Sequence, residues 1–134
     1  MTDGSNVSID TKQDLQEVAG NVGRDHARFV REIERANAAG YRLVILVEQG
    51  GVTSIDDAAR WVNRVCRACN RRRMGYCNPT HGMKCAAKRF KPMTGPTLAR
   101  IMERLEEKHG VRFEFCDKRS TARRICELLG VNYN

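Results

Sequence analysis

Two charged side chains near the start of the sequence could act together on a phosphate group. Asp10 and Lys12 are separated by one residue in a short stretch of strand-forming residues, 7–12. Because side chains alternate along a strand, both would lie on the same face. A carboxylate can bind Mg²⁺, and a neighbouring lysine can orient water or stabilise the charge that develops as a phosphodiester bond breaks. The same spacing also suits an ordinary surface ion pair, and the two residues alone leave both interpretations open.

A second group with chemical potential lies in a cysteine-rich segment. Cys66 and Cys69 form a Cys-x2-Cys pair, and Cys77 and Cys85 follow within 20 residues. Four thiolates at such spacing suit a tetrahedral, structural Zn²⁺ site, and His81 could replace either of the last two cysteines. A bound zinc ion would supply folding energy to a segment that has few apolar residues. The alternative is a set of reduced, partly buried thiols.

Positive charge is concentrated in the same part of the chain. From Arg60 to Arg100 there are 11 Lys or Arg residues and no Asp or Glu, although the net charge of the chain is only +8. A basic block of this kind is typical of a nucleic-acid-binding surface, and its alternative is a solvated basic loop. The side chains predicted to contact phosphate are Arg71, Arg72, Arg73, Lys88, Arg89 and Lys91.

Length and composition indicate a single globular domain, 1–134. Hydrophobic residues make up 41% of the chain and charged residues 30%, which favours a globular chain over a disordered one. No apolar run approaches the ~20 residues of a membrane span, and the first residues do not resemble a signal peptide. Six cysteines without an export signal favour a reducing cytoplasm, in which they would be thiols or metal ligands.

The periodicity of apolar residues predicts alternating strands and helices. The first half is expected to contain a strand at 7–12, helical residues over 13–39 and a strand at 41–48, with a break in the helix near Gly20 and Gly23 and a restart at Asp25. A helix capped by Ser54 and Asp57 and an insertion at 63–93 follow. The chain then continues with a helix over 94–110, a strand at 111–116 and a helix over 120–129. This order favours an α/β fold with a short, largely parallel central sheet flanked by helices. Cys116 and Cys126 fall on the last strand and helix and are interpreted as core residues.

Three stretches taken together resemble a known family. They are "SIDTKQDLQEVAGNVGRDHARF", "YRLVILVE" and "GVRFEFCDKRSTARRICELL". They are similar to the XPF-type nuclease domain of excision-repair endonucleases, especially its compact phage and prophage versions. That domain belongs to the PD-(D/E)xK, or restriction-endonuclease-like, superfamily. The resemblance implies a restriction-endonuclease-like fold and a Mg²⁺-dependent, structure-directed DNA endonuclease, in a bacterial host cell and phage-encoded.

The resemblance also implies roles for individual residues. Asp10 would bind Mg²⁺, Lys12 would act at the scissile phosphate and Arg24 would clamp that phosphate, while Glu48 ends the buried strand. The family carries a Gly-Asp on an earlier strand, which here would lie upstream of Met1. Either Asp3 takes the place of this second metal ligand, or the ligand is missing and the nuclease core is impaired or inactive. An acidic position beyond the Lys can be matched by Asp14 or Glu17.

A second function class therefore stays open beside the nuclease. A catalytically inactive protein with the nuclease fold would bind nucleic acid, or a protein or ribonucleoprotein partner, for example as a phage inhibitor of host defence. DNA is the expected partner in the first case, no membrane is expected in either, and a homodimer is one assembly compatible with the sequence.

Overall fold

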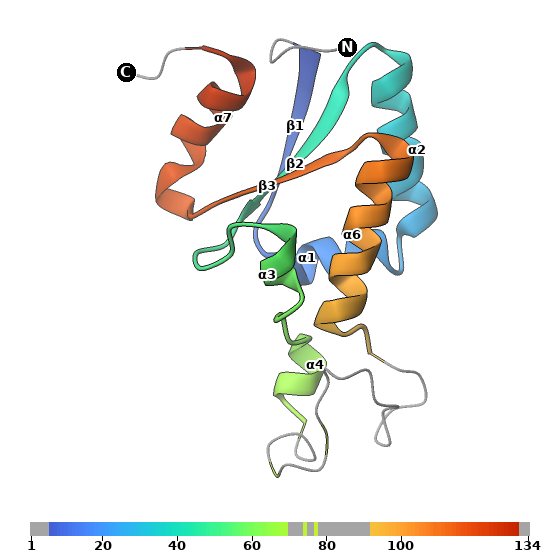
Figure 1. Ribbon diagram of the computed structural model, residues 1–134, viewed down its shortest axis with the longest axis vertical. Coiled ribbons are helices and arrows are strands. Elements are labelled where there is room, and N and C mark those ends of the chain that lie inside the picture. The colour runs from blue at the N-terminus through green and yellow to red at the C-terminus, as the bar shows by residue number, and fades with distance from the viewer. Residues whose placement is uncertain (1–5, 70–73, 75–76, 78–91, 132–134) are drawn as a thin grey trace.

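The sheet is built around one strongly apolar strand. In the computed structural model, which describes residues 6–69, 74, 77 and 92–131, strand β2 (Arg42–Glu48) lies between β1 (Val7–Lys12) and β3 (Arg112–Cys116) (Figure 1). Both pairings are parallel, and the five central residues of β2 are buried. An apolar run without alternation is what a strand covered on both faces requires. The prediction of an α/β fold with a parallel sheet is confirmed for the described residues.

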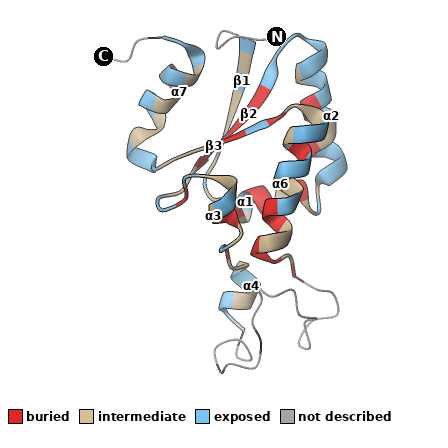
Figure 2. Cartoon of the chain, in the orientation of Figure 1, coloured by how far each residue is buried: buried red, intermediate tan, exposed pale blue. Residues whose placement is uncertain are grey.

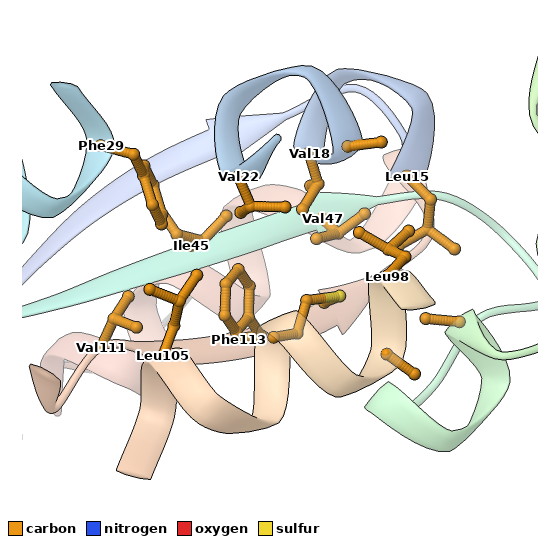
Figure 3. Packing of buried hydrophobic residues seen from close by; sticks show 14 of the residues in the cluster. Leu15, Val18, Val22, Phe29, Ile45, Val47, Leu98, Leu105, Val111 and Phe113 are labelled. Atoms are coloured by element: carbon orange, nitrogen blue, oxygen red, sulfur yellow. The ribbon is translucent and has the colours of Figure 1, made fainter. Parts of the chain in front are cut away.

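Three helices cover one face of this sheet. Helices α1 (Leu15–Val22), α2 (His26–Ala38) and α6 (Gly95–His109) pack their apolar sides against Ile45, Val47 and Phe113 (Figure 3). The cluster is tightly enclosed: buried members with 0% exposure include Ile33, Ile45, Val47, Leu98 and Met102. Burial of this apolar area is the main stabilising contribution that holds the sheet and the helices together.

The other face of the sheet carries α7 (Thr121–Leu129), which follows the short 3₁₀ turn η3 (Lys118–Ser120) (Figure 1). None of the residues of α7 is buried (Figure 2). Polar contacts attach the helix to the sheet: the Thr121 hydroxyl donates to Glu48 Oε2 at 2.5 Å and lies 3.8 Å from Cys116 Sγ, and the Arg124 guanidinium donates to Glu114. Cys116 and Cys126, expected in the core, are therefore only half-buried.

The predicted break in the first helical stretch is confirmed. Helix α1 ends at Gly23, whose N–H donates to Ala19 O, and α2 begins at His26 after Asp25. A side chain at Gly23 would place its Cβ 2.8 Å from Ala19 O and 2.7 Å from Met93 Cε, which explains why glycine occupies this position.

The predicted ends of two further helices are confirmed. Helices α6 and α7 end at Gly110 and Gly130, both with φ of 76°, a left-handed conformation that favours glycine.

The start of the next helix differs from the expected capping box. Helix α3 (Ile55–Ala58) has only four residues, and Ser54 makes no side-chain capping bond. Instead Asp57 Oδ2 accepts hydrogen bonds from the Thr53 N–H at 2.8 Å and from the Thr53 hydroxyl at 2.9 Å. The carboxylate therefore reaches one residue further back than the sequence pattern predicts.

The two ends of the cysteine-rich segment, at Asn63 and Met93, are joined by a hydrogen bond. Asn63 caps α4 (Arg64–Arg67), and its Nδ2 donates to Met93 O at 3.2 Å. Asn63 Oδ1 also accepts from Gln16 of α1, so the start of the segment is attached to the core. Across the described ranges, no helix is both long enough and apolar enough to cross a membrane.

Candidate functional site

Asp10 and Lys12 are in contact, as their spacing predicts. Lys12 Nζ lies 3.2 Å from Asp10 Oδ2, and the two side chains are 15% and 41% exposed. Their partners across the parallel pairing are Val47 and Ile45, which face the main hydrophobic cluster. The ion pair therefore lies on the helix-covered face, on a strand at the edge of the described sheet.

Asp10 also lines a cleft of about 460 Å³ between β1 and α2. Glu32 and Arg35 of α2 line the same cleft. Asp10 and Glu32 are oxygen ligands of the kind that Mg²⁺ prefers, and Lys12 and Arg35 provide positive charge beside them. Within the residues that the structure describes, no group of three or more His, Cys, Asp and Glu is arranged to hold a metal ion.

Arg24 is not joined to this pair by a direct contact. Its side chain is 84% exposed in the turn between α1 and α2, and its ion pair is with Asp25 at 3.6 Å. The resemblance placed Arg24 at the reacting phosphate, so a contact there requires the substrate to extend to this turn.

The two candidates for a further acidic position both serve the start of α1. Asp14 Oδ1 accepts from the Glu17 N–H at 2.9 Å, and Glu17 Oε1 accepts from the Gln13 N–H at 2.8 Å. Such reciprocal capping satisfies backbone donors that the first helical turn leaves without partners. The structure therefore gives Asp14 and Glu17 a capping role.

A second cleft, of about 570 Å³, lies at the carboxyl ends of the parallel strands. Sequence reasoning did not identify it, although parallel sheets commonly bind ligands at this edge. The segments that follow β1, β2 and β3 meet there with the connection between α3 and α4, which lies below the sheet in Figure 1. The lining residues are Gln13, Asp14, Gln16, Glu48, Gln49, Gly50, Arg60, Trp61, Val62, Arg67 and Lys118.

Some charged side chains in this carboxyl-edge cleft have a partner within the protein, and others make no ion pair with a described residue. Glu48 accepts the Thr121 hydroxyl, and Arg60 is bonded to Asp57. Arg67 and Lys118 also line the cleft, and neither makes an ion pair with another described residue. The cleft therefore presents two uncompensated cations.

Asp57 and Cys116, which lie next to lining residues of this cleft, have shifted pKa values. The hydrogen bond from the Thr53 N–H, with further bonds from the Thr53 hydroxyl and Arg60, lowers the pKa of Asp57. Burial raises the pKa of the Cys116 thiol, and Glu48 and Asp117 add to this effect. Cys116 therefore remains a protonated thiol at neutral pH, which does not suit a nucleophile.

The predicted zinc ligands are only partly within the described residues. Cys66 lies in α4, Cys69 lies two residues after the helix ends, and Cys77 is half-buried. The other predicted residues lie outside the described residues: Asp3, Arg71, Arg72, Arg73, His81, Cys85, Lys88, Arg89 and Lys91.

The structure thus contains two groupings with different chemistry. The edge-strand pair Asp10–Lys12 combines a carboxylate with an ammonium, and the carboxyl-edge cleft combines amides with unpaired cations. No protein-family model matches this chain, and neither the curated proteins nor the solved structures include one that matches it.

Proposed function

We propose that this protein binds DNA and cleaves phosphodiester bonds with a divalent metal ion, as a restriction-endonuclease-like domain of the XPF type. The observation that carries this proposal is the contact between Asp10 and Lys12 on one face of an edge strand, at 3.2 Å. The proposal is also supported by the resemblance of the surrounding sequence and by the parallel α/β architecture.

In this proposal each residue has a chemical role. Asp10 would hold Mg²⁺, with Glu32, which lines the same cleft, as a further oxygen ligand. Bound Mg²⁺ supplies charge stabilisation at the phosphate oxygens. Lys12 is held by Asp10 in a mostly buried position, so its ammonium is pre-oriented and costs little reorganisation when negative charge develops on the phosphate.

A protein that binds nucleic acid without cleaving it is the second candidate. It is favoured by the charge distribution, because the 11 cations from Arg60 to Arg100 are not accompanied by any acidic residue. Binding through these cations does not require a complete metal site at Asp10.

A cleavage assay separates the two candidates. Branched and single-stranded DNA are incubated with Mg²⁺ or Mn²⁺ and with wild type, Lys12→Ala or Lys108→Ala. Lys108 is an exposed lysine in the last turn of α6 and serves as the matched control. We expect Lys12→Ala to lower the rate about 10²–10³-fold, and Lys108→Ala to leave it unchanged.

Two outcomes would contradict the nuclease proposal. DNA binding by the wild type without cleavage of either substrate would favour the second candidate. Equal rates for Lys12→Ala and Lys108→Ala would place the active site elsewhere.

A further inference from the structure

The carboxyl-edge cleft begins immediately after the proposed catalytic strand. Gln13, the residue after Lys12, forms part of its lining. The segment that follows β2 contributes Glu48 and Gln49, and Lys118 follows β3, so the three parallel strands all end at this cleft. A ligand in the cleft would thus lie next to the end of β1.

The first cations of the basic block form one wall of this cleft. Arg60 and Arg67 lie within the acid-free stretch that starts at Arg60, and Lys118 follows β3, the strand at the opposite edge of the described sheet from β1. Asp57 engages Arg60, whereas Arg67 and Lys118 have no ion pair with a described residue. Two cations from different elements therefore remain available to an anion in the cleft.

The acidic residues in the lining are both engaged by the protein. Glu48 Oε2 accepts the Thr121 hydroxyl at 2.5 Å. Asp14 Oδ1 accepts the Glu17 N–H at 2.9 Å and lies at the start of α1, where the helix dipole offsets negative charge. These contacts reduce the repulsion that an incoming anion would experience.

Gln49 adds a neutral donor whose orientation is determined by the fold. Its Oε1 accepts the Leu15 N–H at 2.8 Å, and because a backbone N–H can only donate, the oxygen must face Leu15. The Gln49 amide nitrogen therefore faces away from Leu15, and no described residue accepts its hydrogens. An N–H donor beside two cations suits a phosphate oxygen.

We propose that the carboxyl-edge cleft binds the phosphodiester backbone of a nucleic-acid strand through Arg67, Lys118 and the Gln49 amide. This inference rests on the proposed nucleic-acid function and specifies the path of the strand from Lys12 along the carboxyl edge of the sheet. A free phosphate compound offers the same chemical groups, so the experiment must distinguish the two sources.

The test compares two double variants that remove the same number of charges. Arg67→Gln/Lys118→Gln removes the two unpaired cations that line the cleft. Arg31→Gln/Arg119→Gln removes two exposed cations, from α2 and η3, that lie outside both the cleft and the basic block. Binding of a fluorescein-labelled oligothymidylate of about 12 nucleotides is measured by anisotropy over a salt series. EDTA is present, so that no metal-dependent cleavage occurs, and pyrophosphate is added as a competitor in a second arm.

The loss of two phosphate contacts should reduce the slope of log K against log salt by about 1.4 for a single strand. At about 0.1 M salt this corresponds to an affinity loss of about 25-fold. The control double variant should stay within about threefold of the wild type.

Three results would overturn the inference: equal losses for both double variants, no loss for the cleft variant, or binding of pyrophosphate without binding of the oligonucleotide. Cleft-dependent binding by a wild type that does not cleave DNA would support the inference and refute only the nuclease. If the wild type cleaves DNA but the cleft double variant binds the oligonucleotide as tightly as the wild type, only the inference is refuted.

Discussion

Among the described glycines, Gly95, the first residue of α6, leaves the least room for a side chain, and replacing it with alanine should destabilise the protein. A Cβ at this position would lie 2.4 Å from Ala59 O and 2.6 Å from Trp61 O. Ordinary contact begins at 3.4 Å, so the two backbone segments would have to separate by about 1 Å. Both contacts are with backbone carbonyls, which cannot rotate away as a side chain can.

The loss of stability depends on the buried residues that α6 contributes to the core. Leu98 and Met102, in the same helix, are 0% exposed, so a shift of the helix disturbs the centre of the core. Overpacking of this kind costs about 1–3 kcal/mol, and a backbone clash belongs near the upper value. The gain in helix propensity from glycine to alanine is below about 1 kcal/mol. We therefore expect Gly95→Ala to lower the free energy of unfolding by about 2 kcal/mol.

Gly20→Ala is the matched control, because a Cβ there meets no atom within 4 Å and the residue lies inside α1. It should raise the free energy of unfolding by about 0.5–1 kcal/mol through helix propensity. Urea unfolding followed by circular dichroism measures both variants. Equal stability of the two variants would refute the close packing of α6 against residues 59–61.

Three further perturbations test other parts of the structure. The hydrogen bonds from Thr53, together with Arg60, lower the pKa of Asp57. The ionised Asp57 carboxylate therefore stabilises the fold above the unfolded pKa of about 4. This stabilisation is lost as the pH falls through the lower folded pKa. Asp57→Asn should therefore lower Tm at neutral pH by an amount that vanishes in strong acid, and a difference independent of pH would contradict this linkage. The cysteine-rich segment should contain one zinc ion per chain that Cys66→Ser removes, and elemental analysis that finds no zinc in the wild type would exclude the site. Replacing Arg71, Arg72 and Arg73 with glutamine should reduce the salt slope of single-strand binding by about 2, whereas an unchanged slope would remove these residues from the interface.

Local sequence signals predicted most of the described fold. The apolar run at 41–48 identified the central strand because a strand buried on both faces cannot alternate with polar residues. Gly110 and Gly130 identified the ends of α6 and α7 because both adopt a left-handed conformation. The contact of Asp10 with Lys12 followed from the two-residue period of a strand.

Tertiary placement accounts for what the sequence did not reveal. Arg67 and Lys118 are separated by 51 positions and come together only because the strands are parallel and end at one edge. The half-buried state of Cys126 depends on how α7 meets the sheet, through Glu48 and Glu114, and not on the periodicity of the helix itself. Arg24 was assigned by resemblance, and the local chain instead turns it towards solvent and Asp25.

The most direct test of the central claim is the single-turnover rate of DNA cleavage as Mn²⁺ is titrated, for the wild type and Asp10→Asn. Asparagine keeps the size of the side chain and a hydrogen-bonding oxygen but removes the negative charge that holds Lys12 and that would bind the proposed metal ion. If Asp10 binds the catalytic metal, the variant should require more Mn²⁺ and react about 10²–10³-fold more slowly at saturation. Identical metal dependence and identical rates for the two proteins would show that Asp10 and Lys12 are only a structural ion pair.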